Sequence, residues 1–259
     1  MTSAAAPIGL ALRDWRHRRR LSQLDLALEA GVSARHLSFL ETGRSKPSRE
    51  MVLHLADQLE VPLRDRNALL LAAGFAPVFA EHALDDAELA PVRDALDKVL
   101  AGHEPYPAVV VDRSWELIAA NRAAGLLTDG IAPELMAPPA NVLRASLHPD
   151  GLAPRIANLA QWREHVLGRL ARQVALMRDP ALQTLLDELR GYPAGGDPPP
   201  PAQHDVFVPL RVRTAGGELA LLSTIATFGT AVDVTVSELS IESFFPADEA
   251  TARALRELS

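Results

Sequence analysis

The sequence contains no cysteine, no long apolar run and no recognisable secretion signal. Without cysteine, disulfide bonds, cysteine-ligated zinc and thiol catalysis are excluded. No apolar stretch reaches the roughly 18 residues needed to cross a bilayer, so we expect no membrane span. Residues 1–8 lack the basic start and apolar run of a signal peptide. Together these absences predict a cytoplasmic protein that does not act at a membrane.

Motifs of enzymes and metal sites are missing as well. The eight histidines are scattered, and none shows a metal-ligand spacing such as His-x-x-x-His. No Gly-x-Ser-x-Gly, phosphate loop or dinucleotide fingerprint is present, so we predict a protein that is not an enzyme and needs no metal or cofactor. One alternative stays open, a haem-binding domain with His103, His148 or His165 as axial ligand, and a coloured purified protein would indicate it.

Charge is unevenly distributed along the chain. Residues 1–75 contain 11 basic and 8 acidic side chains, a net charge of +3, whereas the remainder contains 15 and 25, a net charge of −10. A basic head on an acidic body is typical of a regulator, because phosphates attract the head and repel the body.

The most informative stretch is residues 21–47, which predicts two short helices joined by a tight turn. Ser22 and Ser33 are suited to cap the two helices, since a serine hydroxyl accepts hydrogen bonds from the free amides of a first turn. Gly31 lies where the first helix should end in the left-handed conformation. Val32 fills the angle between the helices, and Pro47 cannot continue the second one.

This stretch resembles the helix-turn-helix of the lambda- and 434-repressor class, the XRE family, over about residues 8–74. Small, apolar and capping residues at fixed offsets carry the resemblance: Leu21, Ser22, Gln23, Leu26, Ala27, Gly31, Val32, Ser33, Leu37, Ser38, Leu40, Glu41, Gly43, Lys46 and Pro47. It implies that the second helix, 33–42, enters the major groove of double-stranded DNA.

The resemblance also assigns roles to individual side chains. The residues expected at DNA are Gln23, Ser33, Ala34, Arg35, His36, Ser38, Phe39, Arg44 and Lys46. Among these, Arg35 is suited to a guanine edge, whereas Lys46 holds the phosphate backbone. Gln23 either clamps a phosphate or buttresses the reading helix. In the 434-type fold, an arginine matching Arg16 pairs with a glutamate matching Glu41, which implies a structural ion pair here.

The hydrophobic pattern changes after about residue 105, from helical periodicity to a mixture of strands and helices. Strands are predicted over residues 106–112, 115–120, 206–213, 218–228 and 232–237, and long amphipathic helices over 160–177 and 182–189. A proline-rich loop is expected within 191–204, and a last helix from residue 248.

Two strands joined by a short turn, an early Trp115 and then Asn121 as a cap resemble the opening of a PAS domain. The whole of residues 91–257 resembles the ligand-binding domain of MmyB-like regulators, which is PAS-like and follows an XRE head. The expected fold is therefore two-domain: an all-α helix-turn-helix bundle followed by an α+β PAS-like domain with an antiparallel sheet. We expect the bundle over 1–75, a connector over 76–90 and the second domain over 91–259.

The second resemblance implies an apolar effector such as a fatty acid, held between the sheet and the middle helices. The expected wall and polar contacts are Trp115, Asn121, Arg155, Trp162, Val166, Leu170 and Phe228. The alternative is a domain that only dimerises or docks a protein partner. Because one recognition helix reads few base pairs, we expect a homodimer on a pseudo-palindromic operator.

Overall fold

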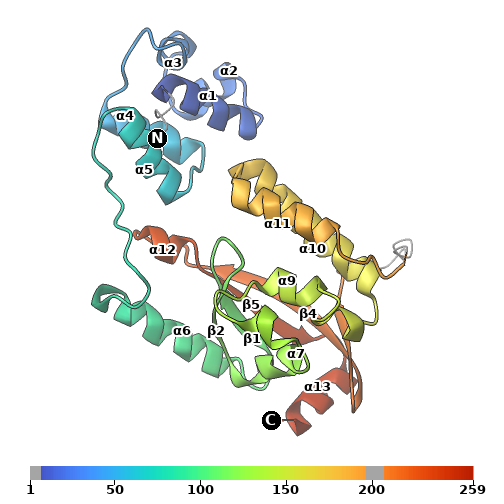
Figure 1. Ribbon diagram of the computed structural model, residues 1–259. Helices are drawn as coiled ribbons and strands as arrows, with labels where there is room; N and C mark the ends of the chain where they lie inside the picture. Colours follow the sequence, from blue (N-terminus) through green and yellow to red (C-terminus); the bar gives the residue numbers. More distant parts are fainter. Residues whose placement is uncertain (1–6, 197–206, 259) are drawn as a thin grey trace. The chain divides into compact units, whose positions relative to one another are not determined.

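The computed structural model describes residues 7–196 and 207–258, and its chain divides into two compact units (Figure 1). The first unit consists of Met1–Ala83 together with Gly229–Ser237, and the second of Leu84–Phe228 together with Glu238–Ser259. The segment Gly229–Ser237, which we call the crossover segment, thus differs from expectation, because the sequence places it within the second domain. Among the described residues, no helix combines the length and apolarity needed to cross a membrane.

The first unit is built around five short helices, as predicted. They are α1 (Ile8–Arg18), α2 (Gln23–Glu29), α3 (Ala34–Glu41), α4 (Arg49–Gln58) and α5 (Leu63–Ala72). Serine hydroxyls cap three of them, since Ser22, Ser33 and Ser48 each accept a hydrogen bond from the amide three residues on. Gly31 adopts a φ of +63° in the turn between α2 and α3, a conformation that glycine enters without steric penalty.

The first unit is packed on fully buried leucines from four helices. Leu12, Leu26, Leu37 and Leu55 are all completely inaccessible. Leu24 of α2 is apolar but 59% exposed. In a seven-residue helix the buried stripe is narrow, and here it consists of Leu26 and Ala27.

A glycine allows α1 to approach α3 unusually closely. A Cβ atom added to Gly9 would lie 2.4 Å from the carbonyl oxygen of Leu40 and 2.7 Å from that of Glu41. Only a residue without a side chain fits at this crossing, so the position of the α3 C-terminus depends on Gly9.

The second unit contains a five-stranded antiparallel sheet, which confirms the predicted PAS-like α+β fold. Its strands are β1 (Ala108–Val111), β2 (Leu117–Ala120), β3 (Leu210–Thr214), β4 (Gly217–Thr227) and β5 (Ser240–Pro246), arranged in the order β2-β1-β5-β4-β3. The first and last strands in sequence therefore lie side by side at the centre.

Helices cover both faces of this sheet (Figure 1). They are α6 (Ala90–Gly102), α7 (Gly125–Thr128), α8 (Pro133–Met136), α9 (Val142–Leu147), α10 (Leu159–Met177), α11 (Pro180–Arg190) and α13 (Glu249–Glu257), with 3-10 turns η1 (Ala87–Leu89), η2 (Arg122–Ala124) and η3 (Ala153–Arg155). Leu96 and Leu100 of α6 pack with Ile241 on one face. On the other face, Trp162 and Val166 of α10 belong to the larger cluster, which also contains α9, α11 and β3–β5.

The predicted strand over 232–237 is wrong. Residues Val234–Ser237 form the short helix α12, and β5, between Ser240 and Pro246, is the strand that completes the sheet. Alternating valines are typical of a strand with one buried face, which is why the pattern predicted one. Only Val234 and Val236 are buried, whereas Val232 is 79% exposed. The end of the proline-rich loop, 197–204, and the start of the predicted strand at Val206 lie outside the described residues.

Candidate functional site

The predicted DNA-reading side chains lie along α3 and the turn after it. Arg35, Arg44 and Lys46 are exposed, and His36, Ser38 and Phe39 are partly exposed. The Ser33 hydroxyl accepts a hydrogen bond from the backbone amide of His36 at 3.1 Å, which fixes the start of the helix. The bundle thus presents cations on the helix that the resemblance assigns to the major groove.

The aromatic ring of Phe39 organises two of these cations. The guanidinium carbons of Arg35 and Arg44 lie 5.4 and 5.8 Å from the ring centroid. Both distances are within the range of cation–π contacts. Phe39 was expected to touch DNA itself, and the structure adds a second role, that of a platform for neighbouring arginines.

A buried ion pair connects α1 to the end of α3. Arg16 donates from Nε to Glu41 at 2.7 Å and from Nη2 at 2.9 Å, and its Nη1 donates to the carbonyl of Leu21 at 2.7 Å. Gln23 adds a hydrogen bond to Glu41 at 2.7 Å, so its side chain contacts the end of the reading helix. The expected Arg16–Glu41 pair is therefore present, and both members are at least nine-tenths buried.

The environment of this pair keeps Glu41 ionised. Burial alone would raise the pKa of the Glu41 carboxyl, but hydrogen bonds from Arg16 and Gln23 and the charge of Arg16 outweigh burial and hold the pKa below its usual value. The carboxylate is thus a permanent part of the helix-turn-helix at neutral pH.

The second unit contains a cavity of about 350 Å³ between the sheet and the helices of its larger core. This volume falls within the usual range for small-molecule sites, roughly 300–1,000 Å³. Its wall is largely apolar and includes Val109, Leu127, Leu143, Ile131, Trp162, Val166, Leu210 and Phe244.

The seven predicted ligand residues divide into three groups. Trp162, Val166 and Asn121 line the cavity. Trp115 and Leu170 are buried in the same core cluster without lining it. Arg155 and Phe228 lie elsewhere, Phe228 against the α6 side of the sheet.

Neither predicted polar contact has a free donor group. Asn121 donates to the carbonyls of Tyr106 and Leu100 and accepts from the amides of Ala108 and Ala124, so its side chain fixes the start of η2. Arg155 donates to three backbone carbonyls in the loops around it. Both residues act as braces of the backbone.

A charged pair in the cavity wall was not predicted. Arg169 of α10 donates from Nη1 to Glu242 of β5 at 3.1 Å and from Nη2 at 3.5 Å. The guanidinium carbon lies 4.3 Å from the ring centroid of Trp115. The Nε atom of Arg169 is buried and has no hydrogen-bond partner. Sequence spacing gave one usable signal, because Arg169 falls on the same helical stripe as Trp162 and Val166.

Two of the histidines named as possible haem ligands, His165 and His103, each contact a residue of the cavity wall. Among the described residues, no three His, Asp or Glu side chains gather closely enough to hold a metal ion. His165 stacks on Trp162 at 5.4 Å, and burial together with the positive charge of Arg169 lowers the pKa of its imidazole. His103 contacts the carbonyl of Phe244 at 3.0 Å and does not itself line the cavity.

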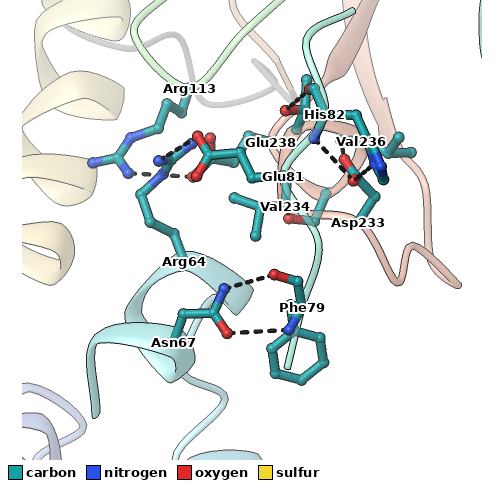
Figure 2. Close-up of polar contacts among 12 residues, drawn as sticks. Arg64, Asn67, Phe79, Glu81, His82, Arg113, Asp233, Val234, Val236 and Glu238 are labelled. Atoms are coloured by element: carbon teal, nitrogen blue, oxygen red, sulfur yellow. Dashed lines mark hydrogen bonds and ion pairs between the residues drawn. The ribbon is translucent and has the colours of Figure 1, made fainter. Parts of the chain in front are cut away.

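The linker after α5 is tied to the first unit (Figure 2). Asn67 donates to the carbonyl of Phe79 at 2.8 Å and accepts from the amides of Val78 and Phe79 at 3.0 and 3.1 Å. Arg64 forms an ion pair with Glu81 at 2.7 Å. The backbone over 78–81 is thereby fixed along α5.

The crossover segment adds to this linker as a short parallel bridge (Figure 2). The amide of Val234 donates to the carbonyl of Ala80 at 2.8 Å, and the hydroxyl of Thr235 donates to that of His82 at 2.7 Å. Asp233 accepts from the backbone amide of His82 and lies 2.8 Å from its Nδ1. A segment located between β4 and β5 in sequence is therefore part of the DNA-binding unit, and α12 packs on α5.

The two units define a helix-turn-helix transcription regulator with a separate ligand-binding domain, and comparisons specify the family. The chain belongs to the MmyB-like regulators, because the family model described as "MmyB-like transcription regulator ligand binding domain" matches residues 92–258. A helix-turn-helix domain model matches residues 7–69. Both are regulator families and neither is an enzyme family.

Other comparisons add little. No curated protein sequence matches the chain. A solved structure titled "Structure of an RNA-binding Light-Oxygen-Voltage Receptor" aligns at 15% identity over 96% of this chain and 61% of that chain, with a TM-score of 0.24. The chain therefore spans less than two thirds of that structure, and a similarity this low carries no argument about fold or function.

Proposed function

We propose that the protein is a sequence-specific DNA-binding regulator whose second domain holds a small apolar effector, such as a fatty acid or a similar amphiphile. The observation that supports this proposal is the apolar cavity of about 350 Å³ between the sheet and α10. Binding of the effector shifts the affinity for the operator, and it can do so only by its different affinity for two states of the protein.

The alternative, a domain that only dimerises or docks a protein, needs no cavity. A well-packed interior contains few voids larger than a water molecule. A cavity of this size with a largely apolar wall therefore favours ligand binding over a purely structural domain.

Occupancy of the cavity is tested by a matched pair of variants. Val166 lines the cavity and is 1% exposed, whereas Val99 on α6 is 47% exposed. We expect mass spectrometry of organic extracts from the full-length protein to release an amphiphile from wild type and from Val99→Trp, but not from Val166→Trp. Added fatty acid or amide should likewise bind only the first two proteins. Equal extracts and equal binding for all three proteins would contradict the proposal.

At DNA, we propose that Arg35 reads a base edge while Arg44 and Lys46 contact phosphates. Their exposure beside α3 supports these roles. We also propose a homodimer on a pseudo-palindromic operator with half-sites separated by about 34 Å or a multiple of it. Sedimentation of the full-length protein with a selected operator tests this, and one protomer per operator would contradict it.

We further propose that the crossover segment transmits the effector signal. It continues directly into β5, which contributes Glu242 and Phe244 to the cavity wall, and its Asp233 holds the linker of the DNA-binding unit. Asp233→Ala should reduce the change in operator affinity caused by the effector, with effector affinity retained. The matched control is Asp85→Ala, which removes the same charge from an exposed linker position. A full response in Asp233→Ala would exclude this route.

A further inference from the structure

The wall of the cavity in the second unit contains a compensated charge pair, and this limits the headgroup that the cavity accepts. We infer that Arg169 and Glu242 select an amphiphile with an uncharged polar headgroup, such as a primary amide or a hydroxyl, over an ionised carboxylate. This inference rests on the proposed function, since it assumes that an apolar ligand occupies the cavity.

The first step concerns the charge already present. Glu242 is 4% exposed and accepts from both Nη atoms of Arg169. The pair therefore brings no net charge to the wall. A buried carboxylate from a ligand would either lie beside Glu242 or take Arg169 away from it, and each arrangement leaves one buried negative charge uncompensated, which is costly.

The second step concerns the hydrogen bonds still to be made. The Nε–H of Arg169 is buried without a partner. A donor left unsatisfied in this way costs the full free energy of its desolvation, so an acceptor oxygen on a ligand gains more here than at an exposed site. The Glu242 carboxylate also retains acceptor capacity, which an amide N–H or a hydroxyl can use. An uncharged headgroup that both accepts and donates satisfies the pair without separating it.

Other polar residues of the wall offer weaker positions for a headgroup. Asn121 and Asn141 use their side chains to bind backbone groups. Arg122 is exposed, so a carboxylate beside it would remain hydrated and would gain little from the ion pair. His165, also on α10, lies close enough to the pair for the charges of Arg169 and Glu242 to act on its imidazole.

The experiment uses the full-length protein and three ligands with one alkyl chain: dodecanamide, dodecan-1-ol and dodecanoate. Affinities are measured by calorimetry below the aggregation concentration of each ligand, at a pH near 8, far above the pKa of about 4.3 of a model carboxyl. For wild type we expect dodecanamide to bind at least about tenfold more tightly than dodecanoate, with dodecan-1-ol between them.

Glu242→Gln removes the negative charge and leaves Arg169 uncompensated, so the order should reverse in favour of dodecanoate. The matched control is Glu164→Gln, which removes the same charge from an exposed position on α10 outside the cavity wall. This control should keep the wild-type order.

A measurement on wild type alone covers the case in which Glu242→Gln does not fold. If only the protonated acid fits, its affinity should rise about tenfold for each unit by which the pH falls from 8 to 6, while that of dodecanamide stays constant. Tighter binding of dodecanoate than of dodecanamide by wild type at pH 8 would overturn the inference and leave the proposed function standing. Loss of that preference in Arg122→Ala would then place the carboxylate at Arg122. Binding of none of the three ligands would overturn the proposed function, and the inference with it.

Discussion

An arginine–glutamate pair lies next to the functional surface of each unit, fully buried in the first and partly buried in the second, and the two pairs are built differently. In the helix-turn-helix, Arg16 and Glu41 are 2.7 and 2.9 Å apart at their two contacts, and Leu21 and Gln23 provide further hydrogen bonds. In the ligand domain, Arg169 and Glu242 are 3.1 and 3.5 Å apart, and Nε of Arg169 has no partner.

The difference separates a structural pair from one that lies in the wall of a cavity. The first pair is saturated by neighbouring protein groups, so it can only hold α1 and α3 together. The second is incompletely satisfied beside a cavity, where a ligand can supply the missing hydrogen-bond acceptor. Substitutions in the first pair should therefore change stability, and substitutions in the second should change ligand binding.

The largest effect is expected from Glu41→Ala. It leaves the buried Arg16 charge uncompensated, which typically costs about 3–5 kcal/mol. Chemical denaturation should show a loss of this order, and DNA affinity should fall with it because α3 loses its support. Asp14→Ala, which breaks the less buried Arg18 pair on α1, should cost about 1 kcal/mol or less. Equal costs for the two variants would show that burial of the Arg16–Glu41 pair is energetically unimportant.

The next largest effect is expected at Gly9, where α1 crosses the end of α3 that carries Glu41. Gly9→Ala places a methyl group against the carbonyls of Leu40 and Glu41, and overpacking of this kind costs about 1–3 kcal/mol. Gly102→Ala is the control, because its Cβ meets open space at the end of α6. The melting temperature of Gly9→Ala in thermal denaturation should lie well below that of the control. Indistinguishable melting temperatures would argue against a close crossing of α1 and α3.

Substitutions on the DNA-reading surface should change binding but not folding. Arg35→Ala should cost about 1–3 kcal/mol at the operator and relax preference at one base position. Lys46→Ala should weaken binding to all DNA sequences alike and reduce the slope of log affinity against log salt concentration by about 1. Binding-site selection followed by salt titration measures both effects. An unchanged base preference in Arg35→Ala would show that Arg35 does not contact a base edge.

The smallest effects are those of pH, and the two units should respond in different windows. Burial lowers the pKa of His165 below its usual 6.5, so the unfolded chain takes up that proton first and the second unit loses stability as the pH falls below 6.5. The lowered pKa of Glu41 gives the first unit stability that is lost as the pH falls below about the usual 4.5 of this carboxyl.

Urea midpoints in single-tryptophan variants can follow the two units separately, because Trp15 reports on the first and Trp162 on the second. His165→Asn should flatten the dependence of the second unit between pH 6.5 and 5. A loss of stability of the first unit already at pH 6 would contradict the assignment of its pH response to Glu41.

The sequence predicted the DNA-binding unit well because its signals are local. Serine caps and the turn at Gly31 act within a few residues, so they can be read without knowing the fold. The Arg16–Glu41 pair, by contrast, came from resemblance, since nothing in a spacing of 25 residues indicates contact.

The ligand domain was predicted only in outline. Periodicity identified its sheet and its long helices, but valine alternation at 232–237 predicted a strand, whereas Val234–Ser237 form α12 in the other unit. The periodicity of apolar residues indicates which side chains are buried, but it does not indicate which unit buries them. The Arg169–Glu242 pair was missed for the same reason, because it joins a helix and a strand 73 residues apart.

The central claim, that occupancy of the cavity controls DNA binding, is tested most directly by operator affinity with and without the dodecyl ligand that binds wild type most tightly, for wild type and Val166→Trp. The operator is first obtained by binding-site selection with the full-length protein. We expect a change of fivefold or more for wild type, the lower end of typical allosteric coupling of about 5–150-fold, and no change for Val166→Trp. The same operator affinity in all four measurements would contradict the account.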